Sequence, residues 1–217
     1  MKKGHRRTIT PEEIEEIKYR HRSVKEILTE MKDISEKIVD LAYSALIFDS
    51  KDMAEEVETL EYKMDKLLYE IRLAAMLAAR TVDDANQLSG ILQVASAAES
   101  MSNAAGDIGE LLDQSLESRV GLTFTFQDGD EKIRSIVISP ESSMRKKSIG
   151  ALKVESETGT RIIALKRGSK WVYDIEKNIV LKKFDTIIVR GVEDGLNELE
   201  AYASSALKWG TYKRGGR

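Results

Sequence analysis

The chain contains no cysteine among its 217 residues. Disulfide bonds, thiolate metal sites and cysteine nucleophiles are therefore excluded. Long apolar runs are also missing: the longest, Leu73–Ala79, is much shorter than the roughly 20 apolar residues that a membrane-spanning helix needs. The basic N-terminus, Met1–Arg7, is not followed by the apolar core of a signal peptide. We therefore expect a cytoplasmic protein without direct membrane insertion, peripheral to a membrane only through a partner.

Catalytic constellations are missing as well. The two histidines, His5 and His21, are isolated from each other and from other residues at metal-ligand spacing. Ser142, Ser143 and Ser148 are not framed as a nucleophile elbow. No glycine-rich motif of phosphate-binding enzymes occurs. We therefore predict that the protein is not an enzyme.

Charge and glycine content both change near residue 119. Residues 1–119 carry 24 Asp and Glu against 16 Lys and Arg, a net charge of −8, whereas residues 120–217 carry 13 against 18, a net charge of +5. Three glycines occur between residues 5 and 119, and ten occur from residue 120 onward. This asymmetry predicts two domains with different partners.

The acidic half predicts three amphipathic helices. Thr10, Pro11 and Glu13 form a helix start signal, and breaks follow at Phe48–Asp52 and Thr81–Asp84. Apolar residues at helical spacing in these three segments include Ile14, Ile17, Val24, Leu28, Met31, Ile34, Ile38, Leu41; Val57, Met64, Leu68, Ile71; and Leu88, Ile91, Leu92, Ala95, Ile108. Long amphipathic helices joined by short turns form an antiparallel bundle.

The basic half switches to β-branched residues with a period of two. Candidate strands are Leu122–Phe126, Ile133–Ile138, Arg161–Arg167, Trp171–Tyr173 and Thr186–Val189, and candidate helices are Ser148–Val154 and Glu193–Ala206. The fold class is therefore multidomain, α and α+β. We predict a three-helix bundle over residues 1–119, a linker or leading strand over 120–132, a small α+β domain over 133–207 and a basic tail over 208–217.

Carboxylates stand where the bundle would bury apolar residues. Glu61 lies on or beside the apolar stripe of the second helix, and Asp65 follows one turn later on the same side. The third helix repeats this pattern with Glu99, Asn103 and Asp107 among small residues. Carboxylates from facing helices form metal sites for Mg, Mn, Fe, Zn or Ca in bundles. The alternative is a set of solvated acids paired with nearby basic side chains.

This helical half resembles the PhoU family. The resemblance lies in the Glu-x-x-x-Asp motif, which Glu61 and Asp65 match, and in the corresponding stretch of the third helix, where Asn103 replaces the expected aspartate after Glu99. It covers roughly residues 20–118 and implies a three-helix bundle whose motif acids hold a metal cluster.

The basic half resembles the TrkA C-terminal domain, also called the RCK C-terminal domain. The matching stretches are Lys147–Leu152, Thr158–Gly168 and Leu181–Gly191, with Lys146 and Phe184 where glycines are usual. The resemblance implies a homodimer that binds a small regulatory ligand or ion and attaches to potassium channels or other cation transporters. It therefore implies a regulatory or accessory role in potassium transport. The alternatives are a metal-binding signalling protein of the phosphate-uptake type and a structural oligomerisation module.

Basic residues in this half suggest where an anion would bind. A helix expected to begin near Ser148 would attract anions at its N-terminus, and cations flank it. The candidate ligand-binding residues are Arg145, Lys146, Lys147, Arg161, Arg167 and Lys170. They would suit a phosphate-bearing ligand such as a cyclic dinucleotide, and the alternative is a solvated basic face. Binding of nucleic acid is not expected, because exposed aromatics and known motifs are missing.

Overall fold

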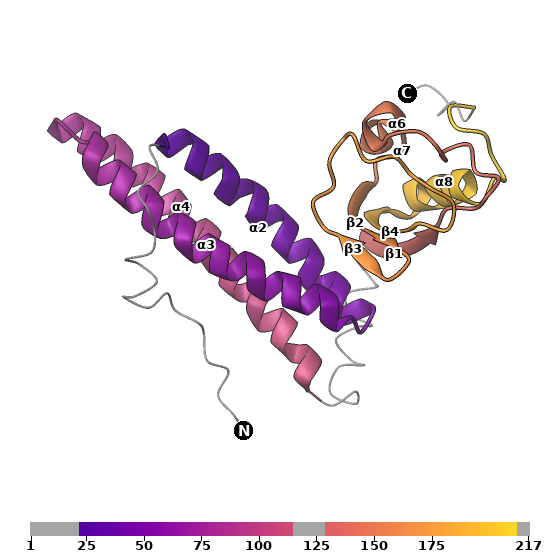
Figure 1. Cartoon of the computed structure of the whole chain (residues 1–217). Coiled ribbons are helices and arrows are strands. Elements are labelled where there is room, and N and C mark those ends of the chain that lie inside the picture. The colour runs from indigo at the N-terminus through magenta and orange to yellow at the C-terminus, as the bar shows by residue number, and fades with distance from the viewer. Residues whose placement is uncertain (1–21, 115–128, 212–217) are drawn as a thin grey trace. The chain divides into compact units, whose positions relative to one another are not determined.

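The computed structural model describes residues 22–114 and 129–211. By its internal contacts the chain divides into two compact units, residues 1–119 and 120–217 (Figure 1). The predicted boundaries of the linker and of the tail remain predictions, as do those of the two domains. Thr10, Pro11, His5, His21, the candidate strand Leu122–Phe126 and the end of the tail lie outside the described residues.

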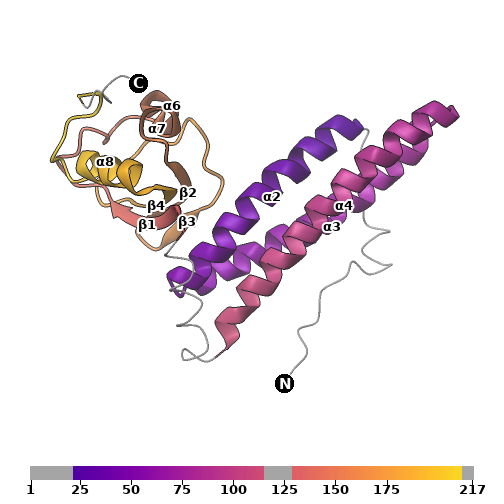
Figure 2. The same ribbon diagram turned by 180° about the vertical axis from the view of Figure 1, so that it is seen from behind.

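The first unit is the expected bundle of three antiparallel helices. Its long helices are α2 (Val24–Ile47), α3 (Lys51–Ala78) and α4 (Val82–Glu110), followed by the 3-10 turn η1 (Leu111–Asp113). Each long helix packs against the other two, as both views show (Figures 1 and 2). In the described part of the chain, no helix is both long and apolar enough to cross a membrane.

Side-chain caps decide where these helices begin. The Ser23 hydroxyl accepts a hydrogen bond from the Glu26 amide at 3.2 Å, and the Glu26 carboxylate accepts one from the Ser23 amide at 2.8 Å. This reciprocal box satisfies amides that a helix start leaves without partners, so α2 begins at Val24. The sequence predicts a first helix that continues through Ser23 without a break. This expectation is wrong at Ser23, because the capping box starts α2 at Val24. Thr81 and Asp84 form the same box at the start of α4, where the cap was expected.

The buried side chains of the bundle are mostly large on α2 and α3 and small on α4. The buried residues of α4 are Ala95, Ala98, Ser102, Ala105, Gly106 and Gly109. The buried apolar residues of α2 and α3 include Ile27, Met31, Ile34, Ile38, Leu41, Met53, Val57, Leu60, Met64, Leu67 and Ile71. Small side chains let the backbone of α4 come close to its neighbours, and this close approach shapes the candidate site described below.

The second unit is an antiparallel sheet with helices. Its strands are β1 (Glu131–Val137), β2 (Arg161–Arg167), β3 (Lys170–Val172) and β4 (Thr186–Val192), in the spatial order β1-β4-β2-β3. Its helices are α6 (Ile149–Leu152), α7 (Val154–Thr158) and α8 (Glu193–Ala203). Helix α8 packs on β1 and β4, and one apolar core joins these elements. The fully buried side chains of this core include Leu165, Ile187, Val189, Leu196 and Leu199.

Two expectations about the small unit need correction. The helix predicted over Ser148–Val154 is interrupted at Lys153, whose left-handed φ of 48° separates α6 from α7. The helix predicted over Glu193–Ala206 ends at Ala203. Both errors concern short segments, in which local sequence periodicity has too few turns to locate a helix end.

Candidate functional site

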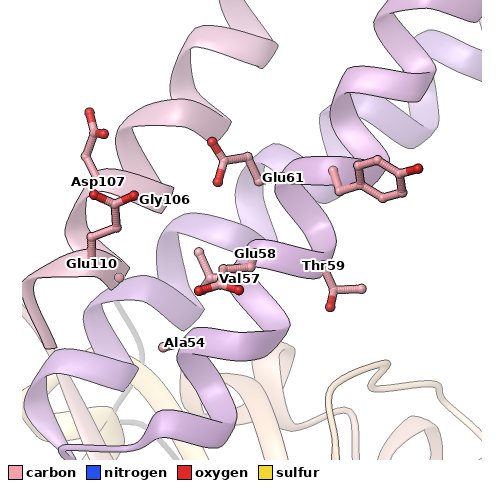
Figure 3. Close-up of a pocket in the computed structure, with 10 residues that line it drawn as sticks. Ala54, Val57, Glu58, Thr59, Glu61, Gly106, Asp107 and Glu110 are labelled. Carbon is pink, nitrogen blue, oxygen red and sulfur yellow. The ribbon is translucent and has the colours of Figure 1, made fainter. Parts of the chain in front are cut away.

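An acidic hollow lies between α3 and α4 in the bundle. Glu61 extends from α3 toward α4 at Gly106, where a methyl group in place of the glycine hydrogen would collide with the Glu61 carboxylate (Figure 3). The hollow has a volume of about 400 Å³. It is lined by Ala54, Val57, Glu58, Thr59, Glu61, Tyr62, Gly106, Asp107, Gly109 and Glu110. Gly106 therefore makes the space that Glu61 occupies.

A second group of polar residues lies one helical turn away. Burial, together with the charge of the Glu99 carboxylate, raises the pKa of Asp65 to about 6. The Asn103 side-chain amide donates a hydrogen bond of 2.6 Å to the Glu99 carboxylate. Asn103 thus offers Glu99 a donor at the position where the motif would place another carboxylate. The five predicted metal ligands therefore form two groups: Glu61 with Asp107 at the hollow, and Asp65 with Glu99 and Asn103.

These residues do not fit a multinuclear metal cluster. Within residues 22–114 and 129–211, no three histidine, cysteine, aspartate or glutamate side chains are grouped so that they could hold a metal ion. The predicted carboxylates are instead divided between the acidic hollow and the pair Asp65 and Glu99. Sequence reasoning also missed Asp40, a carboxylate of α2 that is 2% exposed. Its position beside the apolar stripe of α2 gave no signal, because adjacent helix positions differ widely in burial.

A basic hollow of about 620 Å³ lies in the small unit. Its cations are Lys153, Arg161 and Lys177. The other lining residues are Ile149, Gly150, Val154, Glu155, Ser156, Thr160, Ile162 and Ile175. Three cations together with several apolar side chains and one carboxylate suit an anionic ligand that also has an apolar part.

Gly150 and Lys153 bring the parts of this hollow together. The Gly150 amide donates to the Lys177 carbonyl at 2.8 Å, and a Cβ atom on Gly150 would lie 2.8 Å from the Lys177 Cβ. Glycine is therefore needed where α6 meets the segment that carries Lys177. Lys153 takes up its left-handed conformation between α6 and α7, which turns the chain along the rim of the hollow.

The helix N-terminus that was expected to attract an anion is already occupied. The Ile149 amide donates to the Ile179 carbonyl at 2.9 Å, and the Ala151 amide donates to the Ser148 hydroxyl at 3.2 Å. With the Gly150 amide also bonded, the first three amides of α6 have partners within the chain. The expectation that these amides bind an anion is therefore wrong, because each already has an acceptor. A ligand in this region would therefore bind to side chains and not to the backbone amides of α6.

The six predicted ligand residues do not gather at one place. Arg161 lines the basic hollow. Lys146 and Lys147 lie on a segment whose backbone pairs with Leu181, through bonds of 2.9 and 3.0 Å. Arg145 precedes them, Lys170 is exposed on β3, and Arg167 binds the Asp185 carboxylate through two hydrogen bonds of 2.8 and 2.7 Å. Sequence reasoning missed Lys153 and Lys177, which stand alone among unlike neighbours in the sequence and have no motif to mark them.

Comparison with protein-family models gives two matches. A model of the PhoU domain matches residues 28–112, and a model of the TrkA-C domain matches residues 133–204. The first match covers most of α2 and all of α3 and α4, and the second covers most of β1, the other three strands and α6, α7 and α8. A search of curated proteins gave no match.

Solved structures with similarity include two RCK C-terminal domains. The RCK_C domain dimer of S. agalactiae BusR in complex with c-di-AMP is 29% identical, covers 34% of this chain and 96% of that one, and has a TM-score of 0.32. The RCK C domain of the potassium transport protein KtrA in complex with c-di-AMP is 27% identical, covers 39% and 95%, and has a TM-score of 0.32. S. agalactiae BusR in complex with its busA-promotor DNA is 18% identical, covers 78% and 99%, and has a TM-score of 0.33.

Because these TM-scores are low, the solved structures do not carry the assignment of the two units. The assignment comes from the two family matches. Each match falls on one of the two structural units, and each unit has the fold that its family resemblance implied. Residues 28–112 of the chain therefore match the PhoU domain, and residues 133–204 match the TrkA-C domain.

Proposed function

We propose that this protein is a cytoplasmic regulatory subunit of cation transport, with potassium as the first candidate ion. In this proposal the TrkA-C domain senses a small anionic ligand, forms a homodimer and acts on a membrane channel or transporter. The TrkA-C match and the basic hollow within that domain support it. No catalytic step is involved.

The basic hollow is the observation on which the proposal depends. Lys153, Arg161 and Lys177 give it three positive charges against the single carboxylate of Glu155. Phosphate groups bind such cations through charge-assisted hydrogen bonds. The hollow is also lined by Ile149, Ile162 and Ile175, and such apolar side chains suit the face of a nucleobase. A nucleotide that carries phosphates is therefore the ligand class that fits.

The experiment is a thermal-shift titration of the full chain with c-di-AMP, ATP and inorganic phosphate. A ligand present at 100 times its Kd stabilises the native state by about 2.7 kcal/mol, so a true ligand raises the melting temperature measurably. We expect Arg161→Ala and Lys177→Ala to reduce the shift. Lys170→Ala is the matched control, because Lys170 is an exposed cation of the same domain that does not line the hollow.

Two results together would end this proposal. One is a melting temperature that no nucleotide changes. The other is a tagged full chain that co-purifies with no cation transporter from its own cells. A shift that survives both Arg161→Ala and Lys177→Ala would move the ligand away from this hollow.

A second candidate function is a metal-dependent signal of the phosphate-uptake type. The observation in its favour is the pair of like charges formed by Asp65 and Glu99, which one divalent cation between the two helices would relieve. Elemental analysis of purified protein for Mg, Mn, Fe and Zn tests it. We expect any bound metal to be lost in Asp65→Asn and kept in Asp83→Asn, which changes an exposed carboxylate of α4. Metal-free protein would exclude this candidate.

A further inference from the structure

Two segments of the small domain lie side by side, and of their residues Ile149 also lines the basic hollow. The Lys146 amide donates to the Leu181 carbonyl at 2.9 Å, and the Leu181 amide donates to the Lys147 carbonyl at 3.0 Å. Ser148 and Val180 form a further antiparallel bridge. Residues 142–149 and 179–186 are therefore held together as one surface.

This surface is basic and partly apolar. Its exposed residues are Lys146, Lys147, Val180, Lys182, Lys183 and Phe184, which we call the lysine–phenylalanine patch. Phe184 is 63% exposed and Val180 is 42% exposed. The one acidic residue in the two segments, Asp185, is 1% exposed and binds Arg167. The patch therefore presents four exposed lysines and an exposed aromatic ring, with no exposed acid in either segment to neutralise the lysines.

The backbone conformation of Phe184 destabilises the fold. Its φ is 65°, a left-handed conformation that suits glycine and is strained for a bulky side chain. The exposed ring does not belong to the apolar core of the domain, and the Lys183 ammonium lies 5.8 Å from its centre. A strained residue whose side chain adds little to the core points to a role outside the chain.

We propose that the lysine–phenylalanine patch binds the surface of a membrane that contains anionic phospholipid. The four lysines would face the lipid phosphates, and the Phe184 ring would enter the headgroup region. The composition favours lipid over a protein partner, because lysine is depleted in protein interfaces, where arginine, tyrosine and tryptophan supply most of the binding energy. Clustered lysines with an aromatic side chain are what attraction to an anionic bilayer requires. This inference goes beyond the proposed function and does not depend on ligand binding in the basic hollow.

The test is co-sedimentation of the full chain with vesicles at low salt. Vesicles of phosphatidylcholine containing phosphatidylglycerol are compared with vesicles of phosphatidylcholine alone. We expect binding to the anionic vesicles and its loss at high salt. Lys182→Gln with Lys183→Gln should weaken binding about 25-fold, since each lysine near an anionic surface contributes about fivefold. Lys25→Gln with Lys51→Gln removes the same charge from exposed positions of the bundle and should leave binding unchanged.

Phe184→Gly separates binding from folding. Glycine adopts a positive φ without strain, so this variant should melt at the same temperature as the parent or higher. It should bind anionic vesicles about tenfold more weakly, because the ring no longer enters the interface. Arg161→Ala, which alters the basic hollow, should bind vesicles like the parent.

Three outcomes would overturn the proposal. The chain fails to sediment with anionic vesicles, or it sediments equally well after the Lys182, Lys183 and Phe184 changes. In the third outcome, the chain does not bind vesicles but binds an acidic peptide such as polyglutamate through the same lysines. The patch would then be a protein-docking surface.

Discussion

Arg167 and Asp185 form a bidentate ion pair in the TrkA-C domain. Arg167 Nε donates to Asp185 Oδ1 at 2.8 Å, and Arg167 Nη2 donates to Oδ2 at 2.7 Å. The Lys182 amide donates a third hydrogen bond to the carboxylate at 2.7 Å, and Arg167 Nη2 also donates to the Val180 carbonyl at 2.8 Å. Arg167 therefore ties the end of β2 to the turn before β4.

This pair predicts that Arg167 stabilises the domain rather than contacting a ligand. Arg167→Ala leaves the Asp185 carboxylate buried without its charged partner, and we expect a loss of about 3–5 kcal/mol in the free energy of unfolding. Both tryptophans of the chain, Trp171 and Trp209, lie in the second structural unit, so their fluorescence during denaturant unfolding reports on that unit alone. Asp185→Asn combined with Arg167→Gln should recover part of the loss, because no charge then remains buried. Unfolding of Arg167→Ala at the denaturant concentration of the parent would contradict this account.

Two glycines of α4 provide a matched comparison. Gly90 has no atom within 4 Å of the place where a Cβ would stand, whereas a Cβ on Gly106 would meet Glu61. Gly90→Ala should stabilise the bundle by about 0.8–1 kcal/mol through helix propensity. Gly106→Ala should stabilise the bundle less than Gly90→Ala does. The difference between the two stabilisations measures the free energy of moving the Glu61 side chain aside. Thermal unfolding followed by far-ultraviolet circular dichroism measures both variants, and equal gains would show that Glu61 has no fixed place at Gly106.

Ser102 buries a hydroxyl for which the described residues supply no hydrogen-bond partner. Its side chain is 0% exposed in the small-residue face of α4. Ser102→Ala removes the desolvated hydroxyl, so we expect the free energy of unfolding to rise by about 1 kcal/mol. Ser100→Ala is the control, because Ser100 is exposed and its hydroxyl donates to the Ser96 carbonyl at 3.0 Å. A clear loss of stability in Ser102→Ala would mean that the hydroxyl has a partner in the native protein.

Asp65 makes the bundle less stable as the pH rises. Burial and the neighbouring Glu99 raise the pKa of Asp65 from 3.8 to about 6, so the folded state holds its proton more tightly than the unfolded chain does. Stability should therefore fall between about pH 4 and about pH 6 and stay lower above that window. Asp65→Asn should stabilise the bundle by about 1 kcal/mol at pH 7, after allowing for partial exposure, and should have little effect below pH 4.

Denaturant unfolding of the helical signal across this pH range measures the effect. Glu99→Gln provides a second reading, because it removes the neighbouring charge and leaves Asp65 in place. It should therefore move the window to lower pH. An Asp65→Asn curve that runs parallel to that of the parent from pH 4 to pH 7 would contradict the assignment.

The sequence by itself determined the two-part architecture. Apolar residues with a helical period end where β-branched residues with a period of two begin, and the net charge changes sign there. Such periods reflect which side of a helix or strand is buried, so they are readable along the chain. The motif residues Glu61 and Asp65, and the stretches around Lys147–Leu152 and Leu181–Gly191, carried the family resemblances that the family matches confirmed.

Only the tertiary structure decided which side chains share a site. Lys177 and Arg161 line the same hollow, where the Lys177 carbonyl pairs with the Gly150 amide, and Arg167 binds Asp185, 18 positions further along the chain. Asn103 and Glu99 satisfy each other where the motif suggested a metal ligand. Periodicity reports how each element is buried, whereas a site depends on how separate elements pack and on which polar groups already have partners. Both of those are properties of the folded domain, so no local stretch of sequence contains them.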